Sequence, residues 1–189
     1  MSDQPISRYP APDPADLPDD LKAINKEMEE RTGFLPNVFT ALARRPDELR
    51  AFLAYHDALI EKEGGLSKAD REMIIVATSA ENNCQYCVVA HGAILRIRAK
   101  SRHVADQVAI NFRKADIADR QKAMLEFAFK VAHHSDLIDD SDFEALHAHG
   151  FDDEDIWDIA AITALFGMSN RMANFTSMRP NDEFYSMGR

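Results

Sequence analysis

The sequence predicts an all-α, single-domain protein built from packed helical hairpins. Apolar residues recur at helical spacing from about residue 18 onward, and no segment shows the strict alternation of a half-buried strand. Few glycines interrupt these segments, and no internal repeat is evident. With 189 residues, of which 46% are hydrophobic, the chain is long enough to form one sizeable core.

The N-terminal third predicts an extended arm followed by three helices. Residues 1–17 carry four prolines, which favour an extended backbone. A first helix is expected to end near Gly33, because glycine suits the turn after a helix. A short helix is then expected to end before Pro46. A second, longer helix is expected to begin there and to end at the glycine pair at residues 64–65.

The middle of the chain predicts two helices joined by a tight turn. Ser67 and Asp70 form the signature of a capping box, in which each side chain bonds the other residue's backbone amide. The helix that they open should reach residues 82–83, two asparagines that tolerate the left-handed backbone of a turn. A second helix is expected over residues 84–98, antiparallel to the first.

The C-terminal half predicts more helices and a short tail. Helices are expected near residues 101–110, near residues 117–133, from Ser141, and after Asp152 and Asp153. Glu144 lies three residues after Ser141 and would complete another capping box. The helical domain therefore spans residues 18–178, and residues 179–189 form a polar C-terminal tail.

Charge and hydropathy narrow the class of protein. The net charge of −10 argues against a nucleic-acid or anionic-membrane partner, because both require a basic surface. No apolar run approaches the ~18 residues of a membrane helix, and the N-terminus lacks the pattern of a secretory signal. We therefore expect a cytoplasmic protein. There, a close cysteine pair is more often catalytic or metal-binding than a structural disulfide.

The segment "ENNCQYCVVAHGAIL" contains both cysteines of the chain, Cys84 and Cys87, and a histidine, His91. At about 100° per residue, Cys87 lies roughly 60° and His91 roughly 20° from Cys84 around the helix, so all three share one face. Cys84 lies at the helix start, where unpaired amides favour a thiolate. An imidazole nearby can take a proton from a thiol. The spacing predicts an activated thiol pair.

A carboxylate is expected opposite the histidine. If the chain reverses at residues 82–83, Glu72 lies about ten residues before the turn and His91 about eight after it. At a rise of about 1.5 Å per residue, the two stand within roughly 3 Å of the same height. A carboxylate there would fix the tautomer of the imidazole.

The pattern Glu72-x11-Cys84-x2-Cys87-x3-His91 resembles that of the alkylhydroperoxidase D-like family, within the carboxymuconolactone decarboxylase superfamily. The context "LSKADREMIIVATSAENNCQYCVVAHGAILR" is similar to the subgroup called peroxidase-related enzymes. The upstream "FLPNVFTALARRPDELRAF" and the downstream "DIWDIAAITALFGMSNRMANF" extend the resemblance over about residues 33–178.

This resemblance implies an all-helical fold and homo-oligomers, trimers or hexamers. It also implies reduction of hydroperoxides by the cysteine pair without haem, metal or other cofactor, with an external dithiol or thioredoxin-like protein as electron donor. By position, Cys87 corresponds to the thiol activated by His91, Cys84 to its disulfide partner, and Glu72 to a member of the proton relay. Tyr86 stands where better-studied members carry a second histidine, and it cannot act as a base near neutral pH. The superfamily's decarboxylases lack the cysteine pair, so lactone decarboxylation is disfavoured.

Other interpretations of these residues were weighed. The cysteines could be small core residues, or could bind zinc with His91 and Glu72, although structural zinc sites usually show two ligand pairs. The histidines of "VAHHSDL" and "LHAHG" could form a metal site, but solvated helix ends are favoured; these are His133, His134, His147 and His149. Asn170 and Arg171 could support the cysteine site, although interface or capping contacts are favoured.

Two further functions stay open at the level of sequence. The first is a dithiol–disulfide oxidoreductase that reduces a partner such as a peroxiredoxin, with Cys84 at the helix start as the attacking thiol. The second is a redox-sensing oligomer without turnover. A thiol peroxidase is the favoured function.

Overall fold

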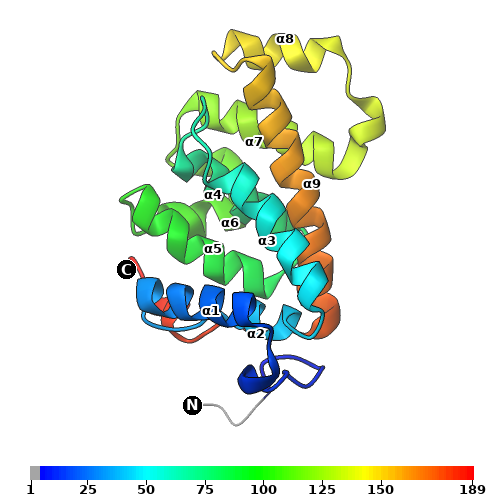
Figure 1. Cartoon of the computed structure of the whole chain (residues 1–189). Coiled ribbons are helices and arrows are strands. Elements are labelled where there is room, and N and C mark those ends of the chain that lie inside the picture. The colour runs from blue at the N-terminus through cyan, green and yellow to red at the C-terminus, as the bar shows by residue number, and fades with distance from the viewer. Residues whose placement is uncertain (1–4) are drawn as a thin grey trace.

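The computed structural model describes residues 5–189 and is built from helices (Figure 1). The α-helices are α1 (Asp19–Thr32), α2 (Asn37–Leu42), α3 (Pro46–Ile60), α4 (Lys68–Glu81), α5 (Gln85–Arg98), α6 (Val104–Asn111), α7 (Asp119–His134), α8 (Asp140–Ala148), α9 (Asp153–Thr176) and α10 (Glu183–Ser186). Short 3-10 turns are η1 (Pro14–Asp16), η2 (Phe112–Lys114) and η3 (Ser135–Leu137). Residues 5–189 contain no strand, which confirms the predicted all-α class.

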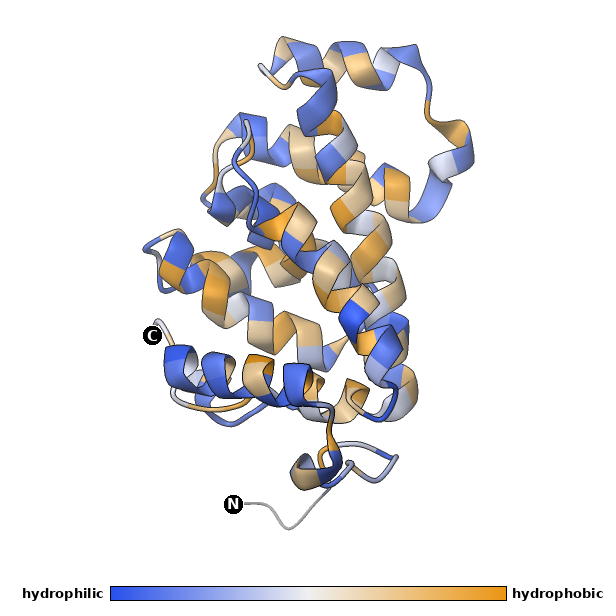
Figure 2. Cartoon of the chain, viewed as in Figure 1, coloured by the Kyte–Doolittle hydropathy of each residue, from blue (hydrophilic) through white to orange (hydrophobic). Residues whose placement is uncertain are grey.

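Helix α4 lies at the centre of the core. It packs against α5, α6, α7 and α9, and its residues 70–79 are all buried. Its aliphatic residues 73–76 stabilise this position, since burial of each large aliphatic side chain contributes about 1.5–3 kcal/mol, and its buried polar residues bond to neighbouring groups. Figure 2 shows the matching pattern, with apolar residues along α5 and α9 and mostly hydrophilic residues on α1 and α8 at the two ends of the molecule.

The local signals of the central hairpin are confirmed. Ser67 Oγ accepts from the Asp70 amide at 3.1 Å, and Asp70 Oδ2 accepts from the Ser67 amide at 3.0 Å, so the predicted capping box opens α4. At the turn, Asn83 has the left-handed φ of 51° expected for asparagine. The reversal here makes α4 and α5 neighbours and sets the register of the side chains between them.

The predicted start of α8 is wrong by two residues. Asp139 is the N-cap residue and Asp142 completes the capping box, so the pair of Asp139 and Asp142 takes the place of the predicted pair of Ser141 and Glu144. The sequence "DDSD" contains several side chains in succession that can cap a helix. The start at Asp139 is stabilised further, because its capping partner Asp142 also forms an ion pair with Lys130 at 2.6 Å.

The two chain ends pack on the helical domain. Residues 1–4 of the predicted arm lie outside the described residues. The rest of the arm runs beside the end of α9, where the Arg8 amide donates to Thr176 O at 2.6 Å. The C-terminal tail packs on α5, because the buried Arg96 donates through Nε to Met187 O and through a terminal nitrogen to Phe184 O, both at 2.9 Å. None of the helices in residues 5–189 is long and apolar enough to cross a membrane.

Candidate functional site

The antiparallel hairpin of α4 and α5 brings Glu72 and His91 together. His91 Nδ1 lies 2.8 Å from Glu72 Oε2, as the height of the two residues predicts. A carboxylate can only accept, so Nδ1 carries the hydrogen and Nε2 is left free to accept a proton. Phe166 of α9 places its ring edge-on to the imidazole, with centroids 4.8 Å apart, and so restricts the rotation of the histidine.

Glu72 is buried and has a second charged partner. Its other oxygen, Oε1, forms an ion pair with an Arg98 guanidinium nitrogen at 3.1 Å. Arg98 also pairs with the more exposed Glu61 at 3.0 Å. A buried carboxylate keeps its charge only when such partners compensate for lost hydration. Arg98 was missed in the sequence, although it lies seven residues after His91 and thus on the same face of α5.

The cysteines lie at the start of α5, and neither is part of a disulfide. Cys84 is the N-cap residue: its sulfur accepts from the Cys87 amide at 3.4 Å, where serine or aspartate would usually provide an oxygen. Both side chains are buried. A sulfur in this position receives a backbone N–H at the positive end of the helix, which favours the thiolate.

The two thiols have opposite pKa shifts. The pKa of Cys84 falls from 9.0 to about 7, chiefly because the Cys87 thiol donates a hydrogen bond to it, with further donors from the Cys87 amide and Asn170 and the charge of His91. The pKa of Cys87 rises, because its thiol hydrogen is held by Cys84 and because it is buried. Of the two thiols, Cys84 is therefore the one that ionises first, and the negative charge of the pair lies on its sulfur at rest.

Helix α9 covers the cysteines from the other side. Asn170 is fully buried: it donates to Ser79 Oγ at 2.8 Å and accepts from Asn82 at 3.0 Å, and its polar side chain acts to lower the pKa of both thiols. Ser169 acts to lower the pKa of Cys87. The structure thus brings Asn170 into the cysteine site. Arg171, in contrast, is exposed and bonds the backbone of its own helix.

A second histidine, His56 of α3, also reaches this region and was missed in the sequence. Its ring centroid lies 6.4 Å from that of His91, and its Nδ1 lies 3.0 Å from Asp57. Burial lowers the pKa of His56, and the nearby His91 lowers it further. No spacing within α4 and α5 could have indicated this residue, because it belongs to a helix that packs on α9.

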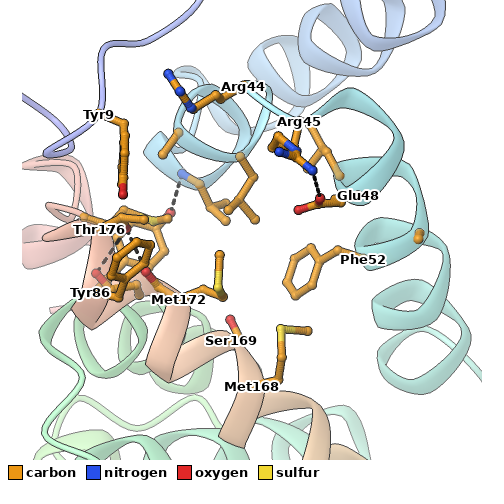
Figure 3. Close-up of a pocket in the computed structure, with 18 of the residues that line it drawn as sticks. Tyr9, Arg44, Arg45, Glu48, Phe52, Tyr86, Met168, Ser169, Met172 and Thr176 are labelled. Carbon is orange, nitrogen blue, oxygen red and sulfur yellow. Dashed lines mark hydrogen bonds and ion pairs between the residues drawn. The ribbon is translucent and has the colours of Figure 1, made fainter.

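An apolar cavity of about 720 Å³ lies between α2, α3 and α9 (Figure 3). Tyr86 and Ser169 form part of its wall; Tyr86 precedes Cys87 in the sequence, and Ser169 is near enough to lower the pKa of Cys87. Several other lining residues also pack on the apolar cluster that contains Cys84 and Cys87, among them Val38 and Leu42. The cavity therefore shares part of its wall with the apolar cluster that surrounds the sulfurs.

Comparison with known proteins decides the family. The family model described as "Carboxymuconolactone decarboxylase family" matches residues 46–134. A crystal structure from Ralstonia eutropha JMP134, described as an alkylhydroperoxidase AhpD core and an uncharacterized peroxidase-related protein, is 65% identical, with 98% of each chain covered and a TM-score of 0.98. An uncharacterized peroxidase-related protein from Silicibacter sp. TM1040 is 39% identical over 100% of both chains, with a TM-score of 0.93. This chain belongs to the alkylhydroperoxidase D-like branch of the carboxymuconolactone decarboxylase family.

More distantly related structures resemble this chain in fold alone. The debrominase Bmp8 is 22% identical over 96% of this chain and 95% of its own, with a TM-score of 0.76. Among proteins with curated functions, no significant match is found. The predicted family and the predicted all-α fold of packed hairpins are thus both confirmed.

In this AhpD-like protein, Tyr86 takes a structural part. Its hydroxyl accepts from the Val38 amide at 3.1 Å, and burial raises its pKa. The side chain thus ties α5 to the start of α2 and stays neutral near pH 7.

Neither metal interpretation gains support from the described part of this AhpD-like chain, where no three histidine, cysteine or acidic side chains are arranged around a common point. In the histidine-rich segment, His147 pairs with Asp153 at 2.8 Å and His133 with Glu81 at 3.6 Å. All four histidines there are exposed or half-buried, as expected for solvated helix ends.

Proposed function

We propose that this chain is a thiol peroxidase that reduces hydroperoxides through Cys84 and Cys87. The observation that carries the proposal is the position of Cys84 as the N-cap of α5, where its sulfur accepts from the Cys87 amide at 3.4 Å, on the same hairpin as the bonded pair of Glu72 and His91. The similar proteins described as peroxidase-related support it at the level of the family. A peroxide needs a thiolate as its reductant, and this pair has one near neutral pH.

The first step is attack on the peroxide by Cys87, the sulfur linked to the cavity through Ser169. The proton of Cys87 passes to Cys84 across their hydrogen bond, and the Cys87 thiolate attacks the terminal peroxide oxygen. The O–O bond breaks, Cys87 becomes a sulfenic acid, and the leaving alkoxide takes the proton from Cys84. The product is an alcohol, and Cys84 is again a thiolate.

The second step closes the disulfide. The Cys84 thiolate attacks the sulfur of the Cys87 sulfenic acid, and hydroxide leaves as water with the proton that His91 Nε2 accepted when Cys84 ionised. Glu72, bonded to His91 at 2.8 Å, holds the imidazole in place and compensates its charge. An external dithiol or a thioredoxin-like protein then reduces the disulfide by thiol exchange, and the cycle restarts.

A matched pair of cysteine variants tests this order. Reduced protein is mixed with an alkyl hydroperoxide in a stopped-flow instrument, quenched, and mapped by mass spectrometry. We expect the wild type to form the Cys84–Cys87 disulfide. Cys84→Ser should stop at a sulfenic acid on Cys87, because the resolving thiol is missing. If Cys87→Ser reacted with the peroxide as fast as the wild type, the proposed reaction would be refuted.

A dithiol–disulfide oxidoreductase is the second candidate. The lowered pKa of an N-cap cysteine, Cys84, is the feature that this function requires. The apolar cavity beside the cysteines favours a small-molecule hydroperoxide over a protein disulfide as substrate. Trapping a mixed disulfide through Cys84 in the Cys87→Ser variant would favour this second function. The expected trimer or hexamer stays a prediction, to be checked by light scattering.

A further inference from the structure

The cavity beside the cysteines has the dimensions of a ligand site. Its volume of about 720 Å³ lies within the ~300–1,000 Å³ of small-molecule pockets. Hydrogen peroxide would need only a small fraction of this space. The inner wall at Ser169 and Tyr86 adjoins the cluster that contains Cys87, so a bound molecule that reaches this wall brings its end close to the reacting sulfur.

The walls of the cavity suit a flexible apolar chain. Met168 and Met172 of α9 and Phe52 of α3 point into it (Figure 3), and Leu165 and Leu42 also line it. Methionine side chains are unbranched and polarizable, so they adapt to ligands of irregular shape. Met168 and Met172 are also half-exposed, which leaves this apolar surface in contact with water when no ligand is bound.

The opposite side of the cavity is basic. Arg44 and Arg45, in the connection between α2 and α3, lie across the cavity from Ser169 in Figure 3. Among the lining residues in the described part of the chain, Glu48 is the one acidic side chain, and it pairs with Arg45 at 2.7 Å. Two arginines and one glutamate give a formal charge of +1. Arg44 stacks on Tyr9, 5.0 Å from the ring centroid, and forms no ion pair within residues 5–189. This is a local reversal of charge in a chain of net charge −10.

We propose that the cavity binds the hydroperoxide of a long-chain carboxylic acid. The carboxylate is held by Arg44 and Arg45, the hydrocarbon chain lies along Phe52 and Met172, and the peroxide group reaches Ser169. This inference rests on the peroxidase function proposed above and names its substrate class. The reaction is the one already given: the O–O bond breaks, the acid is released as its hydroxy derivative, and the two thiols become a disulfide.

The test compares an acid with its neutral ester. Reduced full-length protein is oxidised by linoleic acid hydroperoxide, by its methyl ester and by tert-butyl hydroperoxide, each below its critical micelle concentration, with thiol loss as the readout. We expect the acid to react about fivefold faster than the ester, the factor that corresponds to about 1 kcal/mol from partly exposed ion pairs. The double variant Arg44→Gln, Arg45→Gln should bring the acid-to-ester ratio close to one.

A matched control and a binding measurement complete the test. Arg102→Gln removes an exposed arginine outside the cavity and should keep the wild-type ratio. The hydroxy acid, which cannot oxidise thiols, should slow oxidation by tert-butyl hydroperoxide in the wild type, and more weakly in the double variant. Equal rates for acid and ester, or a ratio unchanged by the double variant, would overturn the proposal. Failure of the hydroxy acid to compete would also overturn it and favour a second copy of this chain as the cover of the apolar rim.

The two proposals fail in different ways. If none of the three hydroperoxides oxidises the thiols, the peroxidase function itself is wrong. If tert-butyl hydroperoxide oxidises Cys87 but the acid has no advantage over the ester, only the assignment of the cavity is wrong.

Discussion

The hydrogen bond between the two thiols can be tested by two substitutions of nearly the same size. It is the largest cause of the low pKa of Cys84. Cys87→Ala removes the donor, whereas Cys87→Ser replaces the thiol by a hydroxyl that can still donate. Neither change touches the backbone amide of residue 87 or Asn170, so the other donors to Cys84 stay in place.

The expected size of the effect follows from the pKa values. With a pKa of about 7, Cys84 is about half ionised at pH 7, compared with about 1% at its ordinary value of 9.0. Without the Cys87 donor, burial acts against fewer stabilising contacts, and we expect a pKa above about 8. The thiolate fraction at pH 7 then falls below about a tenth. In Cys87→Ser it should stay near the wild-type value.

The assay is the ultraviolet absorbance of the thiolate as a function of pH. Because Cys84 is fully buried, absorbance is preferable to an alkylating reagent, whose rate would also depend on access. Each variant contains a single cysteine, so the titration belongs to Cys84 alone. The reasoning is refuted if the alanine and serine variants titrate together, or if Cys84→Ser shows that Cys87 alone has a pKa as low as the wild-type pair.

Three further predictions concern stability. Glu72→Gln leaves Arg98 and His91 without a buried anion and should lower the free energy of unfolding by roughly 3 kcal/mol, against at most about 1 kcal/mol for the exposed Glu61→Gln; urea denaturation measures both. The pKa of His56 in the folded protein lies below its ordinary value of 6.5, so the unfolded chain takes up that proton first and the free energy of unfolding should fall as the pH drops below 6.5. His56→Gln should make this fall shallower. An unchanged dependence of stability on pH would contradict the prediction. Ser67→Ala should cost about 1 kcal/mol through loss of the α4 cap, whereas Ser67→Asn should cost little.

Much of the fold could be predicted because the helices are defined locally. Glycine at residue 33, the asparagine at residue 83 and the Ser67 capping box each act within a few residues, and each was found where the sequence indicated. The start of α8 was missed because several adjacent side chains can cap a helix there. The choice among them depends on Lys130 of α7, a contact between helices that local sequence does not encode.

Part of the candidate site could likewise be predicted from local sequence, and part could not. Glu72, Cys84, Cys87 and His91 lie on one hairpin whose helices are joined by residues 82–84, so helix geometry was enough to predict the contact of Glu72 with His91. His56 and the cavity depend on how α3 and α9 pack on that hairpin, which no spacing within the sequence records. The opposite pKa shifts of the thiols depend on which sulfur receives the hydrogen bond, a detail of side-chain orientation rather than of spacing.

The use of a cysteine as the N-cap of α5 has a consequence for the reduction potential. The Cys87 amide and the helix N-terminus stabilise a charged sulfur, and a disulfide sulfur carries no charge to be stabilised. The fold therefore favours the dithiol over the disulfide, and each ~1.4 kcal/mol of this preference raises the potential by about 30 mV. We expect the pair to be more oxidising than structural disulfides, whose potentials lie below about −300 mV, and equilibration with glutathione would measure it. Regeneration by a cellular dithiol is then downhill, and the helix that holds the cysteines also helps to drive the return half of the cycle.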